Sequence, residues 1–562
     1  MENNEIIAKE FRSAFHLSAI PNIRKDVHVL KEVVHYKDGR IVPELRIIEN
    51  FKRPFWVTKE HYQNHKEKKE CETLDRVNQF EATESNLARA VLTRLGSKYN
   101  GKTNLRDALP SPYVYGLNIS AATMIKHYYT KKYPDVSTPY TVCALDTEVD
   151  VDTDELLILS VCMGNNLYVS IKDRMGEGRT DVEKTLKYLY DKYIPDCELK
   201  SNMNVVFELF DSELQMILNT FKRVHEWKPD FLAIWNISYD MEVLLRVLEA
   251  HNVDPKDVFS DPSLPEEYRE FKFVKGPIQK VTESGVLKPL EPREQWHYVD
   301  CPASFYWIDA MSAYNYVRVG GKQVATGYSL DSILGFELGK EYQKLKYKDE
   351  YSEHLTGVDW HKYMANKKPL EYIIYNCWDV MSMLLLDKKT NDLAIALPLL
   401  SGPSEFKIFN SGPKKLVNEL HFFYLDRGLV LGTKGNEVDD DKLLGLSDWI
   451  VLLPNFYIGI NELPATSESV NERYPDVGLT NNIRRFIYDA DQSSGYPSDT
   501  LTANVSKDTT MREVISIGDF DKEVFKLHGI NLMFGKVNHV DYATSMMHFP
   551  TLRQLAEMIE KK

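Results

Sequence analysis

Residues 141–150, TVCALDTEVD, constrain the fold most strongly because an apolar run leads there into two closely spaced carboxylates. The run predicts a strand. In a strand, which rises about 3.3 Å per residue, side chains two positions apart point to the same face. Asp146 and Glu148 would therefore face one spot. Two carboxylates held in this way can bind a divalent metal if further acidic residues converge on them from elsewhere in the chain.

The chain of 562 residues is too long for one core and predicts about three or four domains. Residues 1–135 mix strand-like runs with a helical pattern and predict a mixed α/β N-terminal domain. From 136 to 395, three strands that can form a meander precede an amphipathic helix and another strand. This pattern predicts a layered α/β domain on one mixed sheet, within a multidomain α/β protein.

A polar excursion, residues 255–296, interrupts the second domain. Its alternating run FKFVKGPIQKVTESGVLKPL, residues 271–290, predicts an extended β-hairpin. Beyond residue 395, strand patterns are expected at HFFYLDRGLVLG, DWIVLLPNFYIGI and RRFIYDAD, before a helical ending. These are residues 421–432, 448–460 and 484–491.

Composition bears on the partners and the cellular compartment of the protein, and not on its activity. The formal charge of −14 opposes phosphate binding overall, but a local basic groove can coexist with an acidic exterior, so a nucleic-acid partner stays open. The six cysteines lack CxxC spacing, which argues against a zinc site or disulfide framework and for a reducing compartment. Because the start lacks a signal pattern and no run of 18 apolar residues follows, we expect a cytoplasmic protein without a membrane partner.

Two other stretches place acidic residues in apolar settings. Asp240 follows a strand that should end at Asn236, close to a helix start, where capping of the helix is an alternative role. Tyr375 and Asp379 are spaced i, i+4, which puts the phenol and the carboxylate on one helix face. Taken alone, such a pair is more often an ordinary boundary pair.

An apolar strand with DxE, then N-x2-Y-D, then Y-x3-D resembles the ordered motifs of the DEDDy class of 3′→5′ exonucleases, which have an RNase H-like fold. The resemblance implies that two Mg²⁺ or Mn²⁺ ions are bound by Asp146, Glu148, Asp240 and Asp379, and that Tyr375 orients the attacking water. The residue types fit this chemistry independently, because four carboxylates can offset the charge of two divalent ions and leave positions for water and phosphate.

The stretch FIYDADQSSGYPSDT, residues 486–500, resembles motif A of family B DNA polymerases. By position, the resemblance implies that Asp491 is a palm metal ligand and that Ser494, Gly495 and the neighbouring backbone cradle an incoming triphosphate. Tyr496 would then exclude a ribose 2′-hydroxyl. On local grounds SGYPS also suits a simple turn after a strand.

This second motif departs from the family pattern in three ways. Gly495 replaces the usual Leu, and Asp499 stands where the family generally has an apolar residue. After Ser498, neither the fingers motif K-x3-N-S-x-Y-G nor a palm DTD motif occurs. The resemblance therefore covers only the first part of a polymerase of tailed-bacteriophage type.

That resemblance divides the chain into an N-terminal domain (1–135), an RNase H-like exonuclease domain (136–395), and a return to the N-terminal domain with the start of a partial palm (396–562). It implies the N-terminal subunit of a split phage polymerase, in the host cell cytoplasm, with proofreading exonuclease activity in DNA replication. Nucleotide addition would need a second polypeptide that carries the fingers, the rest of the palm and the thumb.

The partners implied are single-stranded and primer-template DNA, dNTPs once the second chain is present, and a sliding clamp. The 271–290 hairpin is then either a surface insertion or a DNA contact. Two alternatives stay open from the residues: a stand-alone 3′→5′ DNA exonuclease with a vestigial palm, and a replication scaffold or DNA-binding protein with degenerate sites.

Overall fold

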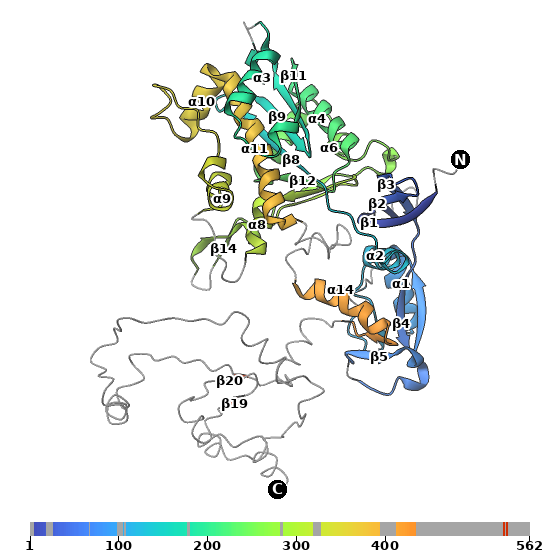
Figure 1. Ribbon diagram of the computed structural model, residues 1–562. Coiled ribbons are helices and arrows are strands. Elements are labelled where there is room, and N and C mark those ends of the chain that lie inside the picture. Colours follow the sequence, from blue (N-terminus) through green and yellow to red (C-terminus); the bar gives the residue numbers. More distant parts are fainter. Residues whose placement is uncertain are drawn as a thin grey trace, which may run out of the picture. The chain divides into compact units, whose positions relative to one another are not determined.

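A computed structural model divides the chain into two compact units, residues 1–434 and 435–562 (Figure 1). The described residues are 5–17, 26–66, 68–97, 105, 108–176, 180–281, 285–318, 327–393, 412–433, 532–533 and 536–537. In the second unit these are the backbones of the paired strands β19 (Leu532–Met533) and β20 (Lys536–Val537). All described side chains belong to the first unit.

A six-stranded mixed sheet forms the centre of the first unit, in the order β11-β10-β9-β8-β12-β17. β8, β9 and β10 form an antiparallel meander, whereas β12 runs parallel to both β8 and β17, and β11 runs parallel to β10. The strands are β8 (Val142–Val149), β9 (Leu156–Met163), β10 (Asn166–Lys172), β11 (Asn204–Phe210), β12 (Phe231–Ile234) and β17 (Tyr306–Asp309). The α/β class and the layered domain on one mixed sheet are confirmed.

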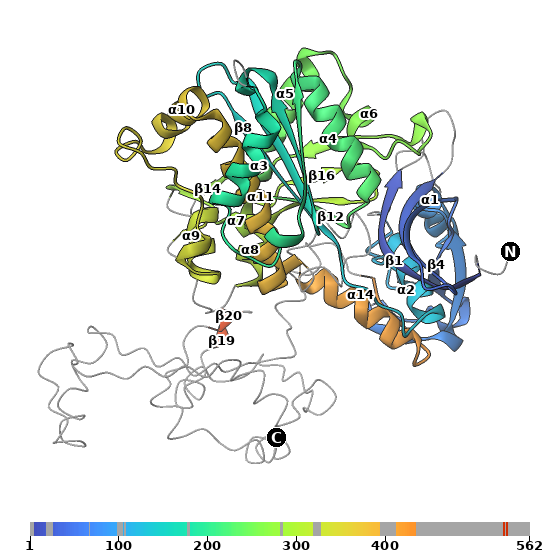
Figure 2. The ribbon, with the colours of Figure 1, turned by 45° about the horizontal axis from the view of Figure 1, so that its top comes forward.

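Helices cover both faces of this sheet (Figures 1 and 2). One apolar cluster joins the sheet to α4 (Glu213–Trp227) and α5 (Ile237–Ala250), and the other joins it to α3 (Val182–Tyr193) and α11 (Pro369–Thr390). Because both faces are buried, the central strands are nearly continuous apolar runs rather than alternating ones. A polar side chain on β8 is therefore at least partly buried.

The alternation along β8 decides where its carboxylates point. Cys143 and Leu145 pack on the α4 and α5 side, and Ala144 packs on the α3 and α11 side. Successive side chains of a strand alternate between faces, so Asp146 and Glu148 share the face of Ala144. α11 packs on this face of the sheet.

The N-terminal elements form smaller sheets. β1, β2 and β3 make one antiparallel sheet, β4 pairs with β6 and β7, and β5 pairs with β18. These strands are β1 (Ile6–Leu17), β2 (Val27–Tyr36), β3 (Ile41–Glu49), β4 (Arg53–Thr58), β5 (Cys71–Thr73), β6 (Val77–Ala82), β7 (Val114–Tyr115) and β18 (Leu429–Leu431). The helices α1 (Glu84–Arg94) and α2 (Ala121–Lys132) accompany them.

Short elements connect β12 to α11. They are α6 (Pro255–Phe259), β13 (Lys272–Val274), β14 (Gln279–Val281), β15 (Leu287–Pro289), α7 (Pro292–Gln295), β16 (Tyr298–Asp300), α8 (Ala310–Val317), α9 (Leu330–Glu337) and α10 (Gly357–Lys367). The predicted hairpin is shorter than expected: β14 pairs with β15, but β13 pairs with β16. Gly276 and Pro277 separate β13 from β14, and Pro removes a donor that a continuous ladder would need.

One expected strand is helical. Residues 421–425, HFFYL, belong to α14 (Gly412–Leu425), and only β18 follows as a strand. The aromatic run favours a strand locally, but its rings are placed by distant partners: His421 lies 5.7 Å from Trp56, and Phe422 stacks on His127 with ring centroids 3.8 Å apart. Tertiary packing overrides the propensity here.

Other expectations meet different outcomes. The segments 448–460 and 484–491 and the helical ending lie outside the described residues. All six cysteines are free thiols. Among the described residues, no helix is both long and apolar enough to cross a membrane.

Candidate metal centre

The centre is built where β8 passes under α11. β8 contributes Asp146 and Glu148, and α11, in the helical layer that packs on this strand, contributes Asp379. α11 begins with Pro369, which suits a first helical turn, and carries Lys388 and Lys389 in its last turn, where cations complement the helix dipole. A long helix with favourable residues at both ends thus holds Asp379 over the sheet.

One carboxylate oxygen from each of Asp146, Glu148 and Asp379 lies within 4.8 Å of the other two. Asp379 is fully buried, and the two strand carboxylates are half-buried. Carboxylate oxygens are the ligands preferred by hard divalent cations. These three residues form a cluster that could bind a metal ion.

Asp240 lies beside this cluster but outside the three-residue group. α5 begins at Ile237, so Asp240 stands in its first turn and is buried. Its Oδ1 accepts hydrogen bonds from the Thr147 amide (3.0 Å) and hydroxyl (2.7 Å). Its charge contributes to raising the pKa of Asp146, so the two carboxylates interact electrostatically.

Tyr375 is brought to the same place by α11. Lys344 Nζ donates to the Tyr375 hydroxyl (3.1 Å) and to Asp379 Oδ2 (2.6 Å). The ammonium group therefore bridges the phenol and the carboxylate. All five residues expected at the exonuclease site, Asp146, Glu148, Asp240, Tyr375 and Asp379, lie at or beside the cluster.

A second layer of polar side chains orients the carboxylates. Asn376 Nδ2 donates to Asp146 Oδ2 (2.7 Å), and its own oxygen accepts from the Ser160 hydroxyl on β9. The Tyr372 hydroxyl donates to Glu148 Oε2. These hydrogen bonds fix the orientation of the Asp146 and Glu148 carboxylates.

Burial dominates the electrostatics of the cluster. It raises the pKa of Glu148 to about 8 and that of Asp240 to about 7, although Lys344 and hydrogen bonds oppose the shift. Burial and then the charges of Asp240, Asp379 and Glu148 raise the pKa of Asp146 well above its usual value. Without a cation, the cluster therefore retains protons at neutral pH.

The pKa of the Lys344 amine is raised as well, but by neighbouring charges and not by burial. Burial alone would lower the pKa of this amine, but Asp379, Tyr375 and Asp146 together raise it well above the ordinary value. Lys344 thus carries a stable positive charge beside the carboxylates. Burial, together with the charge of Asp379, likewise raises the pKa of the Tyr375 hydroxyl, which stays protonated.

The donor set fits a divalent cation. Asp379 Oδ1 is buried and has no hydrogen-bond partner of ordinary geometry among the described residues. A buried carboxylate oxygen without a partner is costly, and a metal ion would satisfy it. Asp146, Glu148 and Asp379 would hold the ion, and oxygen-only ligation favours Mg²⁺, Ca²⁺ or Mn²⁺ over softer metals.

The sequence did not single out Lys344, Tyr372, Asn376 or Thr147. The helix positions offered a signal for two of them: Tyr372, Tyr375, Asn376 and Asp379 follow the spacing i, i+3, i+4, i+7, so they share one face of α11. Lys344 had no such signal, because it stands in a loop 35 residues before Asp379.

The second predicted site cannot be compared with the structure. Asp491, Ser494, Gly495 and Tyr496 lie outside the described residues.

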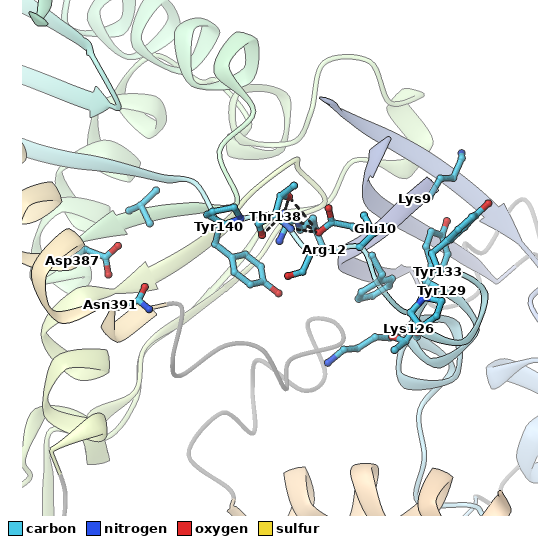
Figure 3. Close-up of a pocket in the computed structure, with 17 residues that line it drawn as sticks. Lys9, Glu10, Arg12, Lys126, Tyr129, Tyr133, Thr138, Tyr140, Asp387 and Asn391 are labelled. Carbon is cyan, nitrogen blue, oxygen red and sulfur yellow. Dashed lines mark hydrogen bonds and ion pairs between the residues drawn. The ribbon is translucent and has the colours of Figure 1, made fainter. Parts of the chain in front are cut away.

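A separate cavity of about 610 Å³ lies away from the carboxylates, between β1, α2 and the segment that leads into β8 (Figure 3). Its polar groups largely bind one another: Arg12 donates to the Thr138 carbonyl oxygen (2.9 Å), and Glu10 Oε2 accepts from the Thr138 amide (2.8 Å). None of the four acidic residues of the centre lines it. It is distinct from the candidate metal centre.

Comparison with protein-family models gives no match to this chain, and comparison with curated proteins gives none either.

Proposed function

We propose that this chain is a divalent-metal-dependent 3′→5′ exonuclease that acts on DNA ends. The observation that carries the proposal is the convergence of Asp146, Glu148 and Asp379 within 4.8 Å, with Asp240 and Tyr375 beside them. The order of these residues along the chain, on a sheet that begins with a three-stranded meander, supports the comparison with RNase H-like nucleases of the DEDDy class.

The side chains have distinct roles in this proposal. The four carboxylates would hold two Mg²⁺ or Mn²⁺ ions, which would supply Lewis-acid stabilisation of the charge that develops on the phosphodiester. Tyr375 orients the attacking water through its hydroxyl. Lys344 Nζ donates a hydrogen bond to that hydroxyl (3.1 Å) and so holds it in place. Because the pKa of Tyr375 is raised, the phenol acts as a hydrogen-bonding group and not as a base.

A denaturing gel tests the activity directly. The substrate is a 5′-labelled primer annealed to a template, with Mg²⁺, all four dNTPs and the full chain alone. We expect shortening without extension, and no shortening in EDTA. Extension would contradict the expectation that nucleotide addition needs a second chain. Intact DNA after incubation with the parent protein would contradict the proposed exonuclease activity.

Substitutions of the ligands test the assignment of the site. We expect Asp146→Ala or Asp379→Ala to slow cleavage at least about a thousandfold, equivalent to roughly 4 kcal/mol of activation free energy, while circular dichroism stays unchanged. Asp387→Asn is the matched control, because Asp387 stands on the same helix but lines the separate cavity. Cleavage near the parent rate in the Asp379 variant would mean that the metal site is assigned wrongly.

We further propose that the chain is the N-terminal subunit of a split family B phage DNA polymerase. The support is the motif A resemblance of residues 486–500. Co-expression with a chain that carries fingers, palm DTD motif and thumb should yield a stable complex that extends primers. Cleavage by the parent with no association would favour a stand-alone exonuclease, and DNA binding without metal-dependent cleavage would favour a scaffold.

A further inference from the structure

We propose that His361 is a positioning residue that orients Glu148 through the hydroxyl of Tyr372. The inference rests on the proposed function, because it concerns a ligand of the proposed metal site. His361 belongs to α10, a helix on which the sequence motifs place no functional residue.

The three residues form a continuous polar chain. His361 Nδ1 lies 2.8 Å from the Tyr372 hydroxyl oxygen, and that hydroxyl is hydrogen-bonded to Glu148 Oε2. His361 Nδ1 is 3.6 Å from the same Glu148 oxygen, beyond a direct hydrogen bond. The imidazole therefore reaches the carboxylate chiefly through the phenol.

The number of protons fixes the direction of the chain. A tyrosine hydroxyl has one proton, and Glu148 must be ionised to bind a metal ion, so in the metal-binding state it can only accept and the Tyr372 proton lies toward it. The hydroxyl oxygen then accepts from His361, whose Nδ1 must carry the proton. A hydroxyl that accepts a hydrogen bond is polarised and donates a stronger one. His361 therefore strengthens the hydrogen bond from Tyr372 to Glu148.

His361 is held in a defined orientation beside the site. Its ring meets the rings of Tyr372 and Tyr375 edge-on, with centroids 5.8 Å and 6.1 Å apart. Its side chain keeps 32% of its surface exposed, whereas Tyr372 is fully buried. His361 therefore contributes little to the buried core. Its main interaction is the polar contact with the Tyr372 hydroxyl.

α10 does not depend on His361 for its attachment. Lys362 forms an ion pair with Asp152 in the turn after β8 (2.5 Å), and Trp360 Nε1 donates to the Tyr347 carbonyl (3.3 Å). The buried Met364 joins the core cluster of α11. A substitution at His361 should therefore leave the helix in place.

Outer partners of metal ligands typically change metal affinity by about 10- to 100-fold when they are removed. Because His361 acts one residue further out, we place its effect at the low end. The structure thus predicts weaker metal binding and a higher Mg²⁺ concentration for cleavage, without a comparable change in DNA binding.

The test compares three variants of the full chain. His361→Phe keeps an aromatic ring without the donor, His361→Asn returns an N–H near the position of Nδ1, and Tyr363→Phe removes a hydroxyl from the same helix that binds Asp349 instead. The readouts are Mn²⁺ affinity by isothermal titration calorimetry without DNA, the Mg²⁺ concentration for half-maximal cleavage, and KM for the DNA end.

We expect His361→Phe to weaken Mn²⁺ binding and raise the half-maximal Mg²⁺ concentration by roughly tenfold, with KM for DNA within twofold of the parent. His361→Asn should recover most of the affinity, and Tyr363→Phe should match the parent. Parent-like Mn²⁺ affinity in His361→Phe would overturn the positioning role while a cleaving parent upholds the nuclease. A parent that neither binds Mn²⁺ nor cleaves would overturn the proposed function itself.

Discussion

At the scale of single residues, Lys344 is the most informative side chain of the centre. Its ammonium group contacts both Asp379 and Tyr375, so it fixes the distance between a proposed metal ligand and the proposed water-orienting phenol. Its pKa is raised well above the ordinary value, so it stays charged throughout the pH range of assays. Lys344 is a positioning group that residue spacing alone does not indicate.

We expect Lys344→Met to slow cleavage about a hundredfold, because loss of the ammonium frees the Tyr375 hydroxyl and a misplacement of about 1 Å can cost that much. Single-turnover cleavage of a labelled single strand measures the effect. Lys346→Met is the matched control, since Lys346 is exposed and pairs with Asp331. Rates within twofold of the parent for the Lys344 variant would contradict the positioning role.

The raised acid pKa values predict how stability depends on pH. Burial raises the pKa of Asp240 to about 7, against about 3.9 for an unfolded Asp. Between these values the folded state binds more protons, so the stability that protonation contributes is present below about pH 4 and is lost as pH rises to about 7. The metal-free protein should therefore be less stable at pH 8 than the uncharged site would allow.

Asp240→Asn should remove this penalty, because the amide oxygen can still accept from Thr147 and carries no charge. In EDTA, we expect its Tm to equal that of the parent near pH 4 and to exceed it by about 4 °C at pH 8, because a pKa rise of roughly three units corresponds to about 4 kcal/mol and about 1 kcal/mol shifts the Tm of a unit of this size by roughly 1 °C. Differential scanning calorimetry measures both. A constant difference across this pH range would show that the Asp240 carboxyl is not the titrating group.

At the scale of elements, α11 links the core to the site. Most of its residues between Leu370 and Leu386 are buried, so the helix is apolar around most of its surface and packs against both the sheet and α3. A helix buried on nearly all sides cannot rotate without losing packing. The spacing of Tyr372, Tyr375, Asn376 and Asp379 then becomes a fixed geometry over β8.

Trp378→Ala tests this support. Trp378 is fully buried, and its Nε1 donates to the Gln343 carbonyl (3.0 Å), so truncation should cost about 3–5 kcal/mol of unfolding free energy. Urea unfolding followed by circular dichroism measures the loss. Phe336→Ala on α9, where the side chain is 47% exposed, should cost less than about 1 kcal/mol. Equal costs for the two variants would contradict the role of α11 as the buried support.

At the scale of the first unit, a buried ion pair joins the N-terminal sheet to the six-stranded sheet. Lys31 of β2 lies 2.7 Å from Asp230, just before β12, and donates to the carbonyls of Lys228 (2.8 Å) and Pro229 (2.6 Å). Asp230 also accepts from the Thr141 amide (2.8 Å), next to β8. The pair thus ties the N-terminal sheet to the strands that carry the site.

We expect Asp230→Ala to destabilise the first unit by about 3–5 kcal/mol, because it leaves Lys31 buried without its counter-charge. The double variant Lys31→Met with Asp230→Ala should recover most of that loss. Urea unfolding of both variants measures the difference. A double variant no more stable than Asp230→Ala alone would show that the unpaired charge is not the cause.

The sequence by itself determined the local patterns of this protein. Alternation in β8 determined that Asp146 and Glu148 share a face, and the i, i+4 spacing put Tyr375 beside Asp379. The meander followed by a helix and another strand predicted a mixed sheet, which the structure contains. Such features depend on residues a few positions apart, so strand and helix geometry is enough to infer them.

Only the tertiary structure decided which distant groups meet. Lys344 and His361 reach the carboxylates from a loop and from α10, and no short-range period relates them to β8. The helical state of residues 421–425 depends on packing with Trp56 and His127, more than 290 residues earlier in the chain. Contacts over such separations arise from burial of the whole core, which local propensity cannot encode.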